Sequence, residues 1–309
     1  MRVLAVTNVW PVGDSFRGIF VREQVDALRK LGVHVDVEVM AQQRGKADYL
    51  LGAHRVRRRI RGGHYDVAHF HYGLTAVAAR LAGPVPTVLS VYGSDVNVPW
   101  QRRITRIGIE HADARIYVSE NLRRAADDSA GHIIAHGVDL ELFQPGERQA
   151  QRSASEHVIL FGAQPANPVK GYDVFTAVLD ELRRRGLKVR ELLLPGQSRE
   201  QVPRKFDAAD LMLFTSRQGT EGSPGVLKEA VVMNLPVVSV DVGDAGQTLD
   251  GVTPSAVVEF GDGLIERLAD AAQKILQGGT RSNGRATAGR FDAMRSAERV
   301  LEIYRSVRR

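Results

Sequence analysis

Short apolar runs alternate with stretches of helical periodicity along the first half of the chain. Strands are expected at 3–6, 33–39, 67–70, 85–91 and 114–118, and helices around 21–31, 75–81 and 104–111. Strands that alternate with helices predict a parallel sheet with right-handed crossovers, because each helix carries the chain back to the start of the next strand. Ligands of such sheets bind beyond the carboxyl ends of the strands.

The second half of the chain repeats this alternation after a polar stretch. From 145 to 156 the residues are mainly Gly, Glu, Arg, Gln and Ser without apolar periodicity, which is typical of a linker. Beyond it, strands are expected at 157–161 and 211–214, and helices around 174–182, 226–233, 263–276 and 284–307. A chain of 309 residues has room for two domains, and the linker places their boundary near residue 148.

The stretch 215–230 carries the strongest signal for a binding site. It follows a short apolar strand and contains a glycine-rich loop that leads into a helix. Ser223 stands where an N-cap hydroxyl belongs, and Pro224 stands at the first helical position, where its missing N–H costs nothing. The unpaired amides of Gly225 and Val226 would face the loop. Such a helix start attracts anions, so a phosphate is the expected ligand.

Two glutamates flank this helix start. Glu229 lies five residues beyond Pro224, about 7 Å along the axis, and its side chain leans back toward the start of the helix. That position suits a carboxylate that binds ribose hydroxyls while a diphosphate rests on the amides. Glu221 lies on the loop and would face the group attached beyond the phosphates. The alternative is a Glu221 that caps the loop and a Glu229 that is merely solvated.

Cysteine content and apolar run length narrow the class of protein. There are no cysteines, which excludes disulfides and thiolate metal sites and is expected of a protein in a reducing cytoplasm. No apolar run approaches the roughly 18 residues of a membrane span, and the N-terminus lacks the pattern of a signal peptide. The expected location is therefore cytoplasmic.

The formal charge of +6 does not by itself predict nucleic-acid binding. Only 6% of the residues are aromatic, and they do not interleave with basic residues as in RNA-binding modules. The excess lies on a predicted amphipathic helix whose apolar side is Tyr49, Ala53, Val56 and Ile60. Its basic residues are Arg55, Arg57, Arg58, Arg59 and Arg61. They form either a solvated face or a surface for an anionic acceptor or for anionic lipids at the inner membrane face.

Glu221, Glu229 and the segment between them resemble a known family. Seven residues separate the two glutamates and include Gly-Ser-Pro-Gly, which looks like the donor-site signature of retaining glycosyltransferases of family 4. The resemblance implies the α/β GT-B fold, with two Rossmann-like parallel-sheet domains that face each other across a cleft. The implied domains are an acceptor-side domain at 1–148 and a nucleotide-sugar donor domain at 149–290. The last helix, about 291–309, would pack back on the first domain.

Further positions match the family on the donor side. The loop around Gly18 is similar to the glycine loop under the donor diphosphate, and Lys170 resembles the phosphate-binding lysine of the family. The arginine that usually partners this lysine is missing after Gly162. Neutralisation of the phosphates would then rest on Lys170 and the helix amides, or on Arg17 or Arg217. The remaining donor-site residues implied by the resemblance are Ser223, Pro224, Gly225, Val226 and Glu229.

The acceptor side of the family is matched by the loop 92–95. Tyr92, Ser94 and Asp95 fall on this loop, although Tyr92 stands where relatives often carry a histidine. His71, at the end of the neighbouring strand, is a weaker candidate, because most such histidines are structural. The catalytic residues implied by the resemblance are Glu221, Lys170 and Asp95.

The implied activity is transfer of a sugar, with retention of configuration, from a nucleoside-diphosphate sugar to a hydroxyl of a glycan, glycolipid or small molecule. The sequence lacks Asp-x-Asp, the cation clamp of the other large glycosyltransferase fold. We therefore expect catalysis without a metal or cofactor, in which Gly18, Gly225, Val226 and Lys170 stabilise the leaving diphosphate. The fingerprints of P-loop kinases, dinucleotide oxidoreductases and Gly-x-Ser-x-Gly hydrolases are also missing.

Two other functions remain open. One is a non-catalytic protein that binds sugar nucleotides as the partner of another transferase, and it is favoured by the missing arginine and by Tyr92. The other is a sugar-nucleotide epimerase on the same fold.

Overall fold

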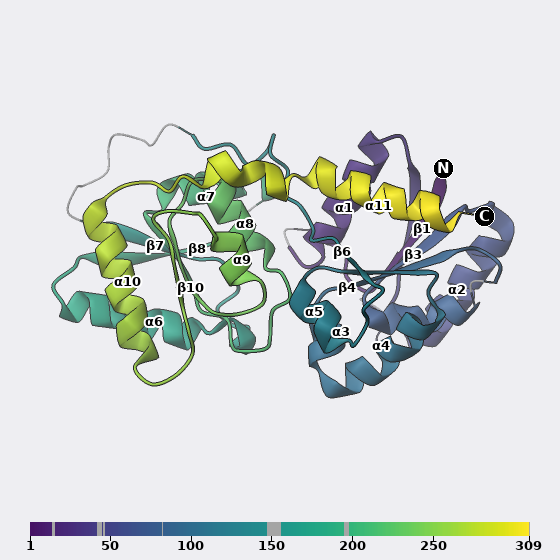
Figure 1. Cartoon of the computed structure of the whole chain (residues 1–309), viewed down its shortest axis with the longest axis horizontal. Coiled ribbons are helices and arrows are strands. Elements are labelled where there is room, and N and C mark those ends of the chain that lie inside the picture. Colours follow the sequence, from purple (N-terminus) through teal and green to yellow (C-terminus); the bar gives the residue numbers. More distant parts are fainter. Residues whose placement is uncertain are drawn as a thin grey trace. The chain divides into compact units, whose positions relative to one another are not determined.

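The computed structural model describes residues 1–13, 16–41, 45, 47–81, 83–146, 156–194 and 198–308, and the chain forms two compact units. Unit 1 consists of Met1–Gly137 and Ala293–Arg309, and unit 2 of Val138–Asp292 (Figure 1). The expected linker at 145–156 lies mostly outside the described residues. The division falls before Val138 rather than near residue 148, because Val138 N–H donates to the carbonyl of Phe291 at 2.7 Å, within unit 2.

Unit 1 contains a six-stranded parallel sheet. Its strands are β1 (Arg2–Thr7), β2 (His34–Val39), β3 (Val67–His71), β4 (Thr87–Val91), β5 (Ala114–Tyr117) and β6 (His132–Ile133). Their order is β2-β1-β3-β4-β5-β6, and Val3 of β1 pairs with Val35 on one side and Val67 on the other. β3 and β4 are buried along their whole length, as expected when helices cover both faces of a parallel sheet. The parallel sheet predicted for the first half is confirmed.

Helices cover both faces of this sheet. They are α1 (Ile19–Lys30), α2 (Asp48–Gly63), the 3-10 helix η1 (Gly73–Leu81), α3 (Ser94–Asn97), α4 (Pro99–His111), α5 (Glu120–Ala125) and α11 (Ala293–Val307). α1 and α11 lie side by side on one face, where Leu28, Val300 and Tyr304 belong to one core cluster (Figure 1). α2 and α4 both pack against η1 on the other face. The helix predicted at 75–81 is present and belongs to a 3-10 helix.

Unit 2 contains a five-stranded parallel sheet in the order β11-β10-β9-β7-β8. The strands are β7 (His157–Phe161), β8 (Val189–Leu193), β9 (Leu211–Phe214), β10 (Val237–Val240) and β11 (Ala256–Val258). The α-helices are α6 (Tyr172–Arg184), α7 (Val202–Ala208), α8 (Gly225–Val232), α9 (Ala245–Leu249) and α10 (Leu264–Gly278). Three 3-10 helices, η2 (Pro168–Lys170), η3 (Arg199–Gln201) and η4 (Gly284–Phe291), complete the unit.

The sequence pattern predicts one continuous helical run at 284–307, but the structure divides this run into two elements. The 3-10 helix η4 ends at Phe291, Asp292 adopts an extended conformation, and α11 begins at Ala293. Asp292 forms an isolated parallel bridge with Val138. A backbone that pairs with another extended segment cannot continue a helix at that residue, so the run is divided.

Each sheet has one point where the strand order reverses. In unit 1 this switch point lies between β1 and β3, and in unit 2 between β7 and β9. Loops that leave the carboxyl ends of neighbouring strands at such a point diverge and leave room for a ligand. In unit 2 the loop after β7 carries Lys170 and the loop after β9 carries Glu221. In unit 1 Gly18 lies after β1, and His71 is the last residue of β3.

Candidate functional site

Lys170 and Glu221 form an ion pair at the switch point of unit 2. Lys170 ends η2, which follows β7, and Glu221 lies on the loop that follows β9. Lys170 Nζ lies 2.6 Å from Glu221 Oε1, and the hydroxyl of Ser216 donates to the same oxygen at 2.7 Å. The Lys170 side chain is 28% exposed and that of Glu221 is 11% exposed. The pair is therefore ordered by the protein and still reachable from solvent.

A glycine allows the two loops to meet. Gly171 has a φ of 66°, and a Cβ at this position would lie 1.9 Å from the carbonyl oxygen of Thr215. The hydroxyl of Thr215 donates to the carbonyl of Gly171 at 2.8 Å. A larger residue at position 171 would separate the loops that bring Lys170 to Glu221.

The start of α8 differs from the expected arrangement. Its N-cap is Pro224, its first residue is Gly225, and no side chain caps it. The predicted N-cap role of Ser223 is wrong, because the Ser223 hydroxyl is engaged elsewhere. It accepts a hydrogen bond from Lys228 Nζ at 2.6 Å and donates one to Asp244 Oδ2 at 2.5 Å. Ser223 thus joins the loop after β9 to the loop after β10.

Lys228 is almost completely buried beneath this loop. Burial lowers the pKa of Lys228 to about 8, and the nearby carboxylate of Asp244 opposes the change. Burial also raises the pKa of Asp244, while Lys228 and the Ser223 hydroxyl act in the opposite direction. The contacts from Lys228 through Ser223 to Asp244 hold the loop that leads into α8.

The first two amides of α8 have no acceptor among the residues that the structure describes. The bonding within the helix starts with Leu227 N–H, which donates to the carbonyl of Pro224 at 3.2 Å. Val226, one position before Leu227, and Gly225, two positions before it, are both partly exposed. Two unpaired N–H groups at a helix start can bind one anion together, as predicted for this segment.

Glu229 pairs with an arginine that the sequence analysis did not single out. Arg199 Nη2 lies 2.7 Å from Glu229 Oε1, and the two side chains are 7% and 9% exposed. The Arg199 guanidinium also lies 4.6 Å from the ring centre of the buried Phe143. Arg199 belongs to η3, beyond the carboxyl end of β8. That position at the ligand-binding edge of the sheet is the signal that would have identified it.

The arginines considered from the sequence lie elsewhere. Arg217 Nη2 pairs with Asp173 Oδ2 at 2.6 Å on the surface of unit 2, and Arg17 is exposed in unit 1. The basic side chain bonded to Glu229 is instead Arg199. The chain thus has no arginine directly after Gly162. Another arginine, Arg199, lies on a different loop and pairs with Glu229.

The two site glutamates share one arrangement. In Glu221 and in Glu229, Oε1 accepts a hydrogen bond from a basic side chain, whereas Oε2 has no hydrogen-bond partner within the described part of the chain. A carboxylate held through one oxygen is oriented, and its other oxygen can accept a hydrogen bond from a ligand hydroxyl. Together with Lys170 and the amides of α8, the site suits a ligand that has both phosphate and hydroxyl groups.

Gly18 lies in unit 1, whereas the other predicted donor-side residues lie in unit 2. It is the N-cap of α1 with a φ of 80°, and a Cβ at this position would lie 2.6 Å from the carbonyl carbon and oxygen of Val9. A glycine is thus required where the loop after β1 folds back on itself. Its contact with a diphosphate stays a prediction.

Asp95 organises the loop after β4. Its buried carboxylate accepts hydrogen bonds from the N–H groups of Gly93 at 2.7 Å, Tyr92 at 3.1 Å and Gly73 at 3.4 Å. Burial raises the pKa of Asp95, and these backbone bonds oppose the change. Asp95 therefore joins the loops after β3 and β4, and its predicted catalytic role is a matter for experiment. Ser94, at the start of α3, is exposed.

Two family models match the chain. The model of "Glycosyltransferase Family 4" matches residues 18–142, and that of "Glycosyl transferases group 1" matches residues 147–278. The chain belongs to glycosyltransferase family 4. A D-inositol 3-phosphate glycosyltransferase of Mycobacterium leprae (strain Br4923) is 25% identical over an alignment of 319 positions, which covers 83% of this chain and 73% of the relative. This chain is accordingly a glycosyltransferase.

Solved structures show that this family 4 glycosyltransferase has the GT-B fold. Sucrose-phosphate synthase of Thermosynechococcus elongatus superposes with a TM-score of 0.78 and 19% identity, covering 99% of each chain. HepE of Anabaena in complex with UDP-glucose superposes with a TM-score of 0.72 and 18% identity, covering 99% of this chain and 100% of HepE. Both parallel sheets of the glycosyltransferase are thus those of the fold implied by the sequence resemblance.

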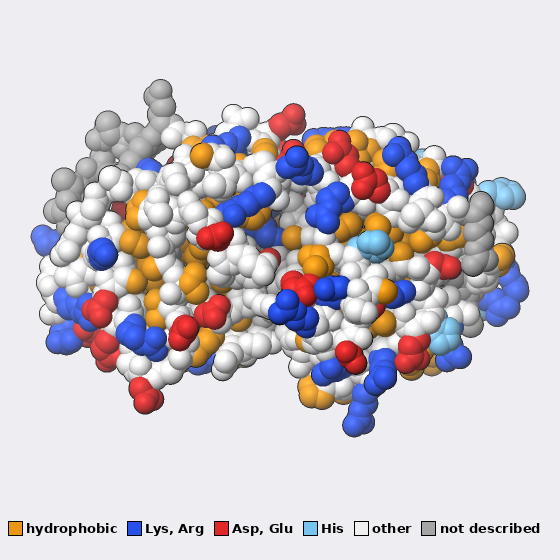
Figure 2. All heavy atoms as spheres, viewed as in Figure 1, with side chains coloured by type: hydrophobic (Ala, Val, Ile, Leu, Met, Phe, Trp, Pro, Cys, Tyr) orange, Lys and Arg blue, Asp and Glu red, His pale blue; other side chains and the backbone are white. Residues whose placement is uncertain are grey.

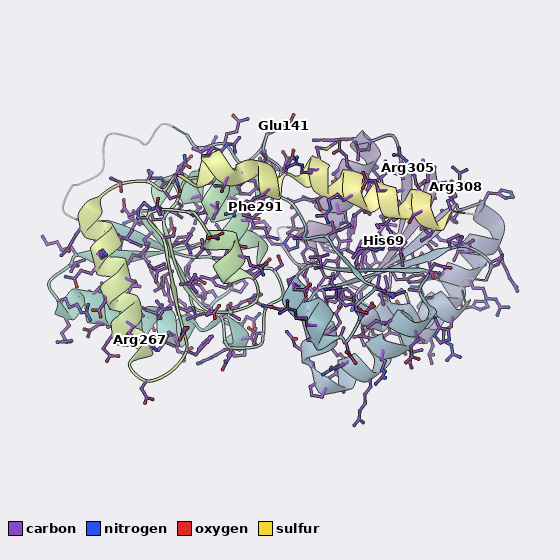
Figure 3. All side chains as sticks on the ribbon, viewed as in Figure 1. His69, Glu141, Arg267, Phe291, Arg305 and Arg308 are labelled. Atoms are coloured by element: carbon purple, nitrogen blue, oxygen red, sulfur yellow. The ribbon has the colours of Figure 1, made fainter. Side chains whose placement is uncertain are left out.

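The histidine and tyrosine candidates of the glycosyltransferase form a buried network in unit 1. His71 Nδ1 lies 2.7 Å from the hydroxyl of Tyr92. His69, beneath α11 in Figure 3, lies 2.6 Å from the hydroxyl of Tyr304 and 2.8 Å from that of Ser90. The rings of His69 and His71 are 4.0 Å apart. Burial lowers the pKa of His71 to about 3, and burial together with His71 lowers the pKa of His69 as well.

These two neutral histidines predict sensitivity to acid. Below a pH of about 6.5 an unfolded histidine binds a proton that the folded site rejects, so the unfolding free energy decreases as the pH falls. Each histidine should contribute a loss of about 1.4 kcal/mol for each pH unit between about 6.5 and 5. Chemical denaturation of the full chain, followed by a probe in unit 1 at several pH values between about 6.5 and 5, measures how the unfolding free energy changes with pH.

The double variant His69→Gln/His71→Gln should show a clearly shallower slope over the same range, even though its stability at neutral pH is lower. His111→Gln, which changes an exposed histidine on α4, is the matched control and should keep the slope of the wild type. An equal slope in all three proteins would contradict the assignment of buried neutral histidines.

The described residues contain neither a metal-binding cluster nor a helix that could cross a membrane. No cluster of three or more His, Asp or Glu side chains in this part of the chain is arranged to hold a metal ion. Among the same residues, no helix is both long and apolar enough to span a bilayer.

Proposed function

We propose that this glycosyltransferase transfers a sugar from a nucleoside-diphosphate sugar to a hydroxyl acceptor, with retention of configuration and without a divalent cation. The observation that carries the proposal is the pair of oriented glutamates beside the unpaired amides of α8. Glu229 Oε2 accepts from a ribose hydroxyl, Glu221 Oε2 accepts from a hydroxyl of the sugar, and Gly225 and Val226 donate to the diphosphate.

The chemistry is electrostatic. The bond between the anomeric carbon and the diphosphate oxygen breaks, and the nucleoside diphosphate leaves with the electron pair. Lys170, which is paired with Glu221, neutralises the charge that develops on the leaving group, together with the amides of α8. The acceptor oxygen then bonds to the anomeric carbon on the face that the diphosphate has left, and its proton passes to an oxygen of the leaving diphosphate. Retention is what membership in the family implies.

The ligands of related structures support a nucleotide donor. HepE of Anabaena was solved with UDP and with UDP-glucose, and the catalytic domain of starch synthase IV of Arabidopsis thaliana with ADP and acarbose. A nucleoside diphosphate has the phosphate and ribose groups that suit Lys170, the helix amides and Glu229. The base and the sugar are left to experiment.

The test is calorimetric titration with UDP-, GDP-, ADP- and TDP-sugars in the presence of EDTA. We expect one tight ligand for the wild type, and Glu229→Gln should weaken its binding by about 1–3 kcal/mol, because a ribose hydroxyl loses a charged acceptor. Glu259→Gln is the matched control, since it neutralises an exposed glutamate of the same unit, and it should bind as the wild type does. Equal affinity of wild type and Glu229→Gln would contradict the ribose assignment.

Product analysis separates the remaining functions. With the bound donor and a panel of hydroxyl acceptors, the proposal predicts glycoside product and free nucleoside diphosphate. Donor binding without turnover would identify a non-catalytic partner protein, a function favoured by the complete engagement of the Asp95 carboxylate with backbone amides. A change of the sugar in the absence of any acceptor would identify an epimerase.

A further inference from the structure

The net positive charge of the chain comes from one unit. Unit 1 contains 24 Lys and Arg against 15 Asp and Glu, a formal charge of +9, whereas unit 2 contains 18 against 21, a formal charge of −3. A charge asymmetry of this kind between two parts of a chain points to an anionic partner for the basic part.

Part of the excess lies on the outward side of α2. Arg57, Arg58 and Arg61 are exposed there, on the opposite side from the buried residues of the helix. Two large apolar residues share this side, since Leu50 is 75% exposed and Leu51 is 64% exposed. A helix side that carries exposed leucines in its first turn and exposed arginines in its later turns differs from a purely polar, solvated face.

Two of the five arginines predicted for this side do not belong to it. Arg55 pairs with Glu38 and with Asp48, each at 2.7 Å, and Arg59 lies 3.4 Å from Glu38. Their charges are neutralised within unit 1. The expected basic surface is therefore narrower than the sequence indicated, and Arg57, Arg58 and Arg61 remain.

The neighbouring helix α4 presents the same combination. Trp100 is 55% exposed, Ile107 is 37% exposed, and the exposed Arg103 lies between them at the i+3 position from Trp100. The opposite side of α4 is buried through Thr105 and Gly108. Tryptophan is a side chain of membrane interfaces, because its ring is apolar while its N–H can remain hydrated.

Both α2 and α4 pack closely on η1, so the opposite side of each helix faces outward. A Cβ on Gly108 of α4 would lie 2.2 Å from Cβ of Ala76 in η1, and one on Gly73 would lie 1.8 Å from the Thr105 hydroxyl. These glycines bring α4 into direct contact with η1, and α2 packs on the same element. We call the following exposed residues the α2–α4 face: Leu50, Leu51, Arg57, Arg58 and Arg61 of α2, and Trp100, Arg103 and Ile107 of α4. Figure 2 shows Lys and Arg side chains along the edge of unit 1 near α3 and α4, with hydrophobic atoms and some Asp and Glu side chains among them.

We propose that the α2–α4 face docks on the surface of a bilayer that contains anionic lipids. The arginines contact the headgroups, and Trp100, Ile107 and the two leucines enter the boundary between headgroups and acyl chains. Nucleic acid would match the charge but would leave four large apolar side chains without a partner. The glycosyltransferase would then be a peripheral protein of the inner membrane face, with unit 1 next to the lipid.

The test is co-sedimentation of the full chain with vesicles of phosphatidylcholine alone and of phosphatidylcholine with phosphatidylglycerol. We expect binding only to the anionic vesicles, and binding should decrease as salt is added. Arg57→Gln/Arg58→Gln/Arg61→Gln should weaken vesicle affinity on the order of a hundredfold, from about fivefold for each arginine near the surface. Trp100→Ser/Ile107→Ser should weaken it about tenfold or more, because apolar area no longer leaves water.

A charge-matched control uses three exposed arginines of unit 2. Arg183→Gln/Arg184→Gln/Arg190→Gln changes the net charge of the chain by the same amount and should leave vesicle binding unchanged. Thermal unfolding and donor titration show whether each variant is folded, and neither readout depends on lipid. The failure of the lipid proposal and the failure of the proposed function are therefore distinguishable.

The fluorescence of Trp100 gives an independent readout. The chain has two tryptophans, and the other, Trp10, is partly buried against the core of unit 1. In a Trp10→Phe background, anionic vesicles should shift the emission of Trp100 to shorter wavelength. The proposal is overturned if anionic vesicles are not bound at low salt, if Trp100→Ser/Ile107→Ser binds them as tightly as the wild type, or if DNA alone is bound through the same arginines.

Discussion

Lys170→Ala is expected to lower kcat about 100- to 1,000-fold, the usual cost of losing one preorganised group that stabilises developing charge. In the wild type, Lys170 Nζ is held 2.6 Å from Glu221 at the switch point of unit 2, on the side of the sheet where the diphosphate is proposed to bind. The substitution removes the positive charge and also releases Glu221 from its ion pair. Steady-state kinetics with the donor identified by calorimetry measure the effect.

Lys188→Ala is the matched control for this prediction. Lys188 is an exposed lysine of the same unit, located before β8, so its loss should leave kcat within about twofold of the wild type. If Lys170→Ala raised KM and left kcat unchanged, Lys170 would stabilise the bound donor and the transition state equally. It would then not selectively stabilise the charge that develops on the leaving group. A kcat equal to that of the wild type, with unchanged KM, would exclude Lys170 from the site.

Arg199→Met is expected to destabilise unit 2 by about 3–5 kcal/mol, because it leaves the buried carboxylate of Glu229 without its partner. Both side chains of this pair are less than a tenth exposed, and Arg199 also packs on the ring of Phe143. Urea denaturation followed by a probe in unit 2 measures the loss. The double variant Arg199→Met/Glu229→Gln should recover most of it, since the remaining amide is neutral.

The control for this second prediction is Arg217→Met. Arg217 pairs with Asp173 at a similar distance, but the two side chains are 49% and 65% exposed. Solvent screens such a pair, and its removal should change the unfolding free energy by at most about 1 kcal/mol. Equal destabilisation by Arg199→Met and Arg217→Met would show that burial does not distinguish the two pairs.

The pair of Arg199 and Glu229 also has a functional consequence. Arg199 holds Glu229 through Oε1, so it should position the carboxylate that is proposed to accept from the ribose. Arg199→Lys keeps the charge but loses the planar guanidinium, and we expect nucleotide affinity to fall less than in Glu229→Gln. Arg199 is a positioning residue in this interpretation, because it acts through Glu229.

The regular elements of both units could be predicted from apolar periodicity. Buried parallel strands need continuous apolar runs, and β7 and β9 have the bounds that their runs indicated. The pattern failed where backbone contacts between distant segments decide the conformation. The bridge between Val138 and Asp292 interrupts a helical run.

The candidate site was predictable as far as it is local in sequence. Glu221, Gly225 and Glu229 lie on one loop and one helix, so their spacing indicated which groups would face a common point. Two partners came from elsewhere in the chain and carried no such signal. Arg199 is 30 positions from Glu229, and Asp244 is 21 positions from Ser223.

The sequence alone therefore determined the alternation of strands and helices, the parallel sheets and the glycine loop that leads into a helix start, because these depend on residues close together in the chain. Only the tertiary structure decided which side chains hold the two glutamates, why Ser223 does not cap α8, and which arginines of α2 form ion pairs with Glu38 and Asp48. These depend on the order of strands in the sheet and on burial, which bring distant residues together and set the cost of leaving a charge unpaired.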